Sequence, residues 1–245
     1  MLKRIRRLLL AGLAVSVLLS SVPRASVQTS TLTDAERQAG WRLLFDGASM
    51  DQWRGYQKPD ATGLRWMIKD GCLALPAADG TDTHGERDLI TKQQFTDFEL
   101  SFEWNISRGG NSGVKYLVTE SHESAIGHEY QIIDDERHED ATLRNRRTAS
   151  FYDVLAAPAA HPRPAGEFNT GRILVTGTHV EHWLNGVKVL EYELGSDALR
   201  SAVAGSKFKD IAGFDQPGAG HLLLQDHGAA ICFRNIKVRG SAVPE

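Results

Sequence analysis

The sequence predicts an all-β protein, an antiparallel β-sandwich or jelly roll of two sheets, on three observations. Short runs of alternating apolar and polar residues recur along the chain, and residues 98–104 alternate without interruption. Asp-Gly at 70–71 and Asn-Gly at 185–186 separate such runs, which is typical of tight hairpins. Helical patterns are confined to 33–39 and 198–206. The turn signals divide the chain into roughly ten or more strands, which two antiparallel sheets bury well.

The first element, residues 1–25, is expected to be a secretory signal peptide. Basic residues at 3–7 precede an apolar run at 8–19, and small residues and Pro23 follow. Such a run is shorter than a membrane span, although an uncleaved anchor helix is the alternative. Residues 26–39 then form an N-terminal extension, and 40–240 form one domain. We therefore expect the protein in the periplasm or outside the cell.

The charge balance argues against nucleic acid as a partner. The chain has 28 Lys and Arg residues against 31 Asp and Glu residues, and five of the basic residues but no acidic ones lie in 1–25. The remainder thus has 23 basic residues and a net charge of −8. A moderately acidic domain without a basic run is not typical of nucleic-acid binding. No membrane partner is expected after removal of the signal peptide, and no pattern indicates an oligomeric state.

The domain then reads as strands joined by turns. The expected strands are at 66–69, 72–75, 98–104, 114–118, 129–133, 172–175, 179–184, 187–190, 221–225 and 231–238. The only two cysteines, Cys72 and Cys232, lie in strand-like segments near opposite ends of the domain. In an oxidising compartment they form a disulfide, or they remain as two buried thiols, and their spacing does not decide between these alternatives.

Three polar clusters on separate expected strands indicate one site of carbohydrate size. Glu129 and Gln131 share one face of their strand because successive side chains alternate, while Tyr130 points to the other face. A glycine-bordered turn with Asn111 lies upstream, and a polar turn at 224–228 lies downstream.

These clusters belong to five motifs that, in series, resemble the 3-keto-disaccharide hydrolase domain family. The motifs are 40–47 with Trp53, 111–113, 129–132, 182–186, and 224–228 with 233–236. They run in order from about residue 40 to residue 239. The resemblance implies a concanavalin A-like jelly roll that is exported and acts on a disaccharide or other glycoside oxidised at C3.

A ketone at C3 acidifies the hydrogen on C2, so that a base can remove it and the enolate can expel the C1 substituent. Addition of water then completes a net hydrolysis, whereas omission of that step gives a lyase. The site needs a base, a donor for the C3 oxygen and an acid for the leaving oxygen. We expect acid–base roles for Glu129, His227 and Glu103, and sugar binding by Asn111, Lys115, Gln131, His182, Gln225 and Tyr152.

Each candidate also has a structural alternative. Glu129 and Glu103 are equally compatible with solvated strand faces, and His182 shares its face with apolar residues, as a core histidine would. The acidic run 134–140 offers Asp134 and Asp135 as oxygen ligands for a divalent cation such as Ca²⁺, or it forms a charged loop at the rim. No cofactor is otherwise indicated, and no histidine pattern indicates zinc.

Two other functions fit the same fold. A laminarinase-like retaining glycosidase would use an acid-x-acid-x-x-acid strand, and Glu129, Gln131 and Asp134 have that spacing. Gln131 cannot ionise, which weakens this reading. A lectin-like binding module without catalysis would show the same strands and aromatic residues.

Overall fold

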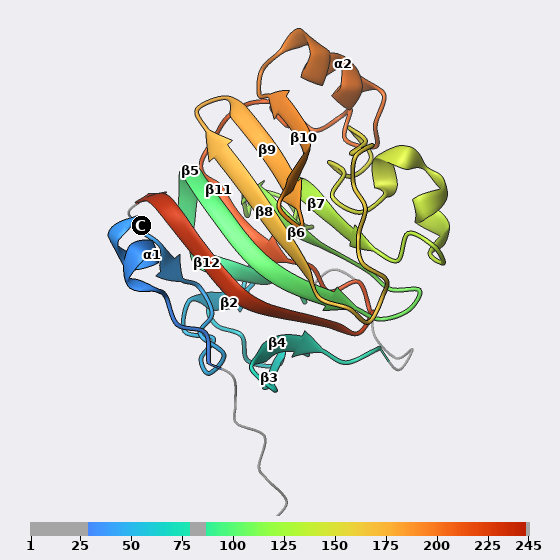
Figure 1. Ribbon diagram of the computed structural model, residues 1–245. Coiled ribbons are helices and arrows are strands. Elements are labelled where there is room, and N and C mark those ends of the chain that lie inside the picture. The colour runs from blue at the N-terminus through green and yellow to red at the C-terminus, as the bar shows by residue number, and fades with distance from the viewer. Residues whose placement is uncertain (1–28, 79–86, 244–245) are drawn as a thin grey trace, which may run out of the picture.

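The computed structural model describes residues 29–78 and 87–243, which fold into antiparallel strands with few helices (Figure 1). The expected signal peptide lies outside the described residues. The strands are β1 (Arg42–Leu43), β2 (Trp53–Gly55), β3 (Met67–Lys69), β4 (Cys72–Leu75), β5 (Leu89–Ile106), β6 (Asn111–Val118), β7 (His128–Ile133), β8 (Asn169–Thr176), β9 (His179–Leu184), β10 (Val187–Glu193), β11 (Gly220–Leu224) and β12 (Ile231–Val243).

The helices are short. The α-helices α1 (Asp34–Gln38) and α2 (Asp197–Ala204) lie where the sequence indicated helix, and the 3₁₀ turns η1 (Glu139–Thr142) and η2 (Arg144–Arg146) follow β7. Thr33 and Glu36 form a capping box at the start of α1, which satisfies backbone N–H groups that the first turn leaves unbonded. In the described part of the chain, no helix has the length and apolarity needed to cross a bilayer.

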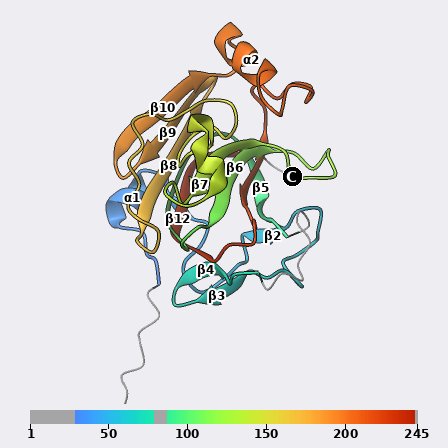
Figure 2. The ribbon, with the colours of Figure 1, turned by 90° about the vertical axis from the view of Figure 1, so that its right-hand side faces the viewer.

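The long strand β5 belongs to both layers of a sandwich. Its second half pairs with β8 on one side and with β12 on the other. The strand order of the first layer is therefore β10-β9-β8-β5-β12-β4-β3. Its first half pairs with β2 and β11. The strand order of the second layer is therefore β2-β5-β11-β6-β7. Figures 1 and 2 show β8, β9 and β10 grouped apart from β6 and β7. The all-β, antiparallel jelly-roll class is confirmed.

Aromatic side chains fill the space between the layers. Phe102 of β5 meets Tyr130 of β7 edge-on at 5.5 Å between ring centroids, and Tyr116 of β6 meets His182 of β9 at 5.7 Å. All four side chains are buried. Burial of rings of this size contributes strongly to stability and fixes how the layers stack.

Both predicted hairpins are confirmed. Asp70 and Gly71 connect β3 to β4, and Asn185 and Gly186 connect β9 to β10, all four with positive φ. Two-residue turns of this kind match the right-handed twist of the flanking strands, and Asn, Asp and Gly tolerate the left-handed conformation they require. The sequence-based strands at 98–104 and 231–238 are longer in the structure, as β5 and β12.

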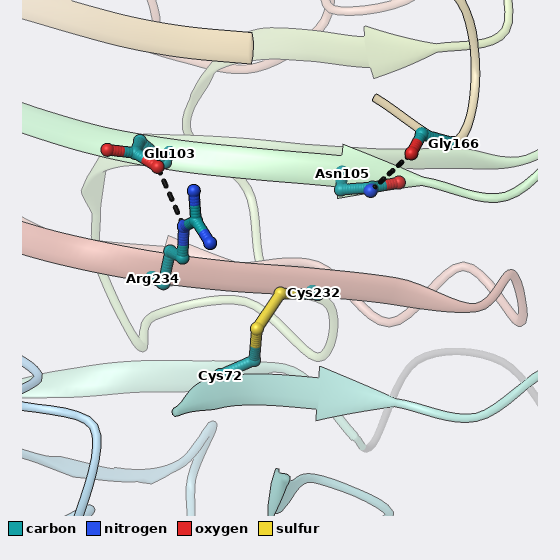
Figure 3. The surroundings of a disulfide bond; sticks show 6 residues. All are labelled: Cys72, Glu103, Asn105, Gly166, Cys232 and Arg234. Carbon is teal, nitrogen blue, oxygen red and sulfur yellow. Dashed lines mark hydrogen bonds and ion pairs between the residues drawn. A yellow bond between two sulfur atoms is a disulfide. The ribbon is translucent and has the colours of Figure 1, made fainter. Parts of the chain in front are cut away.

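The two cysteines form a disulfide between β4 and β12 (Figure 3). It joins positions 160 residues apart in sequence. A crosslink over such a long loop restricts the unfolded chain and thereby stabilises the folded one. It ties the short β3–β4 hairpin to the first layer, since β4 pairs with β12 through only three residues.

Candidate active site

The outer face of the second layer carries a cavity of about 450 Å³. On β7, Glu129 and Gln131 point into it, while Tyr130 points into the core, as the alternation predicted. On β6, Lys115 stands directly opposite Glu129 in the strand register. The cavity therefore has a polar floor made by two neighbouring antiparallel strands.

Loops from five parts of the chain form its walls. The lining residues outside β6 and β7 are Asp88, Ser124, Ala125, Ile126, Gly127, Tyr152, Lys207, Phe208, Ile211, Gln225, Asp226 and His227. The structure thus brings together seven residues that the sequence singled out, namely Glu129, His227, Asn111, Lys115, Gln131, Gln225 and Tyr152.

Glu129 is the buried carboxylate at the centre of this floor. It is 5% exposed, and its Oε2 lies 3.9 Å from the Lys115 Nζ, which also donates a hydrogen bond of 3.0 Å to the Ala125 carbonyl. Burial raises the pKa of Glu129, and the charges of Lys115 and Lys207 oppose that rise. The carboxylate occupies the space above Gly113, where a Cβ would stand 2.5 Å from Oε1. Glycine at 113 therefore leaves room for Glu129.

Asp88, directly before β5, is a second buried carboxyl group of the cavity. It is 6% exposed, and its Oδ1 accepts a hydrogen bond of 2.8 Å from the Asp226 backbone N–H. Burial, assisted by the charge of Asp226 and opposed by that of Lys115, raises the pKa of Asp88 to about 6. Asp226 is bound by Arg65 at 3.1 and 3.2 Å. Asp88 belongs to no motif or alternating pattern, so that the sequence alone does not indicate its place in the site.

Lys207 and Tyr152 form part of the wall above the floor. The Lys207 Nζ lies 4.2 Å from the centre of the Tyr152 ring, whose hydroxyl donates to Asp140 at 3.1 Å. Desolvation lowers the pKa of Lys207, and the charge of Glu129 opposes that change. Lys207 lies in the irregular segment after α2, where no strand period could indicate its direction.

Two amide oxygens of the cavity wall are buried without a hydrogen-bond partner among the described residues: Asn111 Oδ1 and Gln225 Oε1. Buried polar atoms are nearly always bonded, so an orphaned pair in one cavity is a feature of a site built for a polar ligand.

The structure does not bring Glu103 or His182 to the cavity. Glu103 lies on the first layer, where it accepts a hydrogen bond from Arg234 at 2.7 Å (Figure 3). It accepts a second one from Asn235 at 2.6 Å. His182 is completely buried between the layers, bonded to the Tyr116 hydroxyl and the Ala149 carbonyl. Burial lowers its pKa to about 4, so that it is a neutral core histidine.

The expected cation ligands are engaged by the protein itself. Asp134 accepts hydrogen bonds from the backbone N–H groups of Gly109 and Glu136, and Asp135 accepts two from Thr148. They do not line the cavity of Glu129. Among the described residues, three ligand-type groups converge only at His179, Glu181 and Glu191, where Lys188 pairs with both glutamates. A Ca²⁺ requirement remains a prediction from the sequence.

Several known proteins are similar to this chain. A family profile described as 3-keto-alpha-glucoside-1,2-lyase-like domain matches residues 40–239. The chain is 35% identical over 227 residues to a 3-keto-disaccharide hydrolase of Bacteroides thetaiotaomicron, covering 82% of this chain and 78% of that protein. Two crystal structures of candidate glycosyl hydrolases from Parabacteroides distasonis are also similar. One has a TM-score of 0.77 and 28% identity, covering 87% of this chain and 99% of its own. The other has a TM-score of 0.65 and 26% identity, covering 82% and 99%.

The raised pKa of Asp88 predicts a pH-dependent effect on stability. Between its ordinary pKa of 3.8 and about 6, the folded protein binds more protons than the unfolded chain, so that this group makes stability fall as pH rises. Asp88→Asn removes that dependence. The free energy of unfolding of the variant, relative to wild type, should increase by up to about 3 kcal/mol from pH 4 to pH 7.5.

Urea denaturation at both pH values measures this difference. Asp51→Asn, at an exposed turn, controls for the loss of one negative charge. If the free energy of unfolding of Asp88→Asn differs from that of wild type by the same amount at both pH values, the Asp88 carboxyl group is not held in a desolvated site.

Proposed function

Because the chain belongs to the 3-keto-alpha-glucoside-1,2-lyase-like family and is a glycoside-cleaving enzyme, we propose that it cleaves 3-keto-glycosides, including 3-keto-disaccharides, by base-promoted elimination followed by addition of water. The observation that carries the proposal is the buried Glu129 beside Lys115 on the cavity floor. A desolvated carboxylate is a stronger base than one in water, and a neighbouring cation stabilises an enolate oxygen.

The cavity offers residues of suitable chemistry for proton removal and for binding of the enolate. Glu129 removes the proton from C2 of the keto sugar, and the electron pair moves onto the C3 oxygen as the enolate forms. Lys115 and Lys207, which both attract Glu129 electrostatically, hold that oxygen. Asn111 and Gln225 accept hydrogen bonds from sugar hydroxyls. The enolate then expels the C1 oxygen, which requires a proton.

A retaining glycosidase is the weaker candidate on this geometry. Gln131, at the middle position of the acidic pattern, is completely buried, and its Nε2 donates to the Arg146 carbonyl at 3.3 Å. Asp134, at the third position, lies away from the cavity. Of the three carboxyl groups that line the cavity, Asp226 is bound by Arg65. The other two, Glu129 in β7 and Asp88 just before β5, come from different segments and do not reproduce the pattern. A binding module would not need two buried carboxyl groups with raised pKa values in one cavity.

We also propose that the protein acts after export, in the periplasm or outside the cell. The basic and apolar beginning of the sequence supports this, and so does the disulfide, since such bonds persist in oxidising compartments.

The proposal predicts substrate selectivity. The purified protein should release product from a 3-keto-disaccharide and leave its unoxidised parent intact, because only the ketone acidifies the C2 hydrogen. Chromatography of both reactions, with and without chelator, measures this. Cleavage of the parent would favour the retaining glycosidase, and binding of both sugars without turnover would favour a binding module. Loss of activity with chelator would support the expectation that the protein uses a divalent cation.

The role of Glu129 as the base predicts that the same substitution, glutamate to glutamine, has different effects on activity at positions 129 and 103. Glu129→Gln should lower kcat/KM for a 3-keto-disaccharide by about 10²–10⁴-fold, the usual contribution of a general base. Glu103→Gln makes the same chemical change on the first layer, outside the cavity, and should keep kcat/KM within about threefold of wild type, well below such a contribution. Equal and small effects of the two substitutions would contradict the role of Glu129.

A further inference from the structure

The proposed reaction leaves one requirement without a residue, namely the proton for the departing C1 oxygen. Glu129 and the lysines are assigned, Asp226 is bound by Arg65, and the Tyr152 hydroxyl donates to Asp140. Two titratable side chains of the cavity wall then remain, His227 and Asp88. They differ in their surroundings. His227 is exposed at the rim, whereas Asp88 is buried within the wall.

Asp88 lines the cavity and is held in place there. Its Oδ1 accepts the Asp226 N–H, and the next residue after Asp88 begins β5, which fixes the backbone. The charged groups that act on it are Lys115, Asp226 and, through its neighbouring position on the floor, Glu129. Lys115 thus attracts two carboxyl groups, Glu129 and Asp88, within the same cavity. Two carboxyl groups held in different environments are a recurrent arrangement for an acid and a base.

We propose that Asp88, and not His227, is the catalytic acid that protonates the leaving oxygen. This inference rests on the proposed function. As the C1–O bond breaks, its electron pair takes the proton from Asp88, and the electron pair of the enolate forms the C1–C2 double bond and restores the ketone. The Asp88 carboxylate next removes a proton from water, whose oxygen bonds to C1. The new enolate recovers a proton at C2 from Glu129, and both carboxyl groups return to their starting states.

The experiment varies how much the leaving group needs a proton. A 3-keto-disaccharide expels a sugar alkoxide, which needs protonation, whereas a nitrophenyl 3-keto-glucoside expels a stable phenolate, which does not. We expect Asp88→Asn to lower kcat/KM for the disaccharide by about 10²–10⁴-fold and to lower nitrophenol release by less than about tenfold. Because water addition also uses Asp88, the unsaturated ketone should accumulate during turnover of the nitrophenyl substrate by this variant, which its ultraviolet absorbance reports.

His227→Gln is the matched comparison. It should affect both substrates to the same extent, because a sugar contact is independent of the leaving group. The proposal is overturned if Asp88→Asn slows both substrates equally, or if His227→Gln shows the selective loss instead. Failure of wild type to cleave either keto substrate would refute the proposed function itself, and is therefore distinguishable from failure of the assignment of Asp88.

Discussion

The burial of one negative charge, that of Glu129, is the constraint on which the site depends. A carboxylate away from water is costly unless a cation compensates it, and Lys115 does so from the adjacent strand. This requires the β6–β7 register that sets Lys115 opposite Glu129, and it requires glycine at 113, since any larger residue would displace the carboxylate. The same arrangement that stabilises the charge makes it a base next to a cation, which is what proton removal beside a ketone needs.

The sandwich supplies that register. Because the inner faces of β6 and β7 pack aromatic rings against the first layer, a slip by one residue would exchange Glu129 with the buried Tyr130. The core therefore fixes the direction of the polar face. Loops then bring in what strands cannot: Asp88 before β5, the 225–227 turn after β11, and Lys207 after α2. These segments are far apart in sequence and meet only over the second layer.

Much of this fold was predictable from the sequence, and part of the site was. The alternation of apolar and polar residues predicted the strands and put Glu129 and Gln131 on the same strand face. The Asp-Gly and Asn-Gly turns predicted two hairpins. Alternation does not show which layer a polar face belongs to, and for that reason Glu103 was grouped with Glu129 although it lies on the other sheet. Asp88 and Lys207 lie in segments without periodicity, so that only tertiary contacts place them.

The central claim is that the reaction begins with loss of the C2 proton to Glu129, and a deuterium label tests it most directly. A 3-keto-disaccharide carrying deuterium at C2 and the unlabelled compound are compared in single turnovers with enzyme in excess, so that product release does not mask the chemical step. The account predicts slower cleavage of the labelled sugar, because the C2 bond to hydrogen breaks before the glycosidic bond. Equal rates for the two compounds, with the label retained in the product, would contradict it.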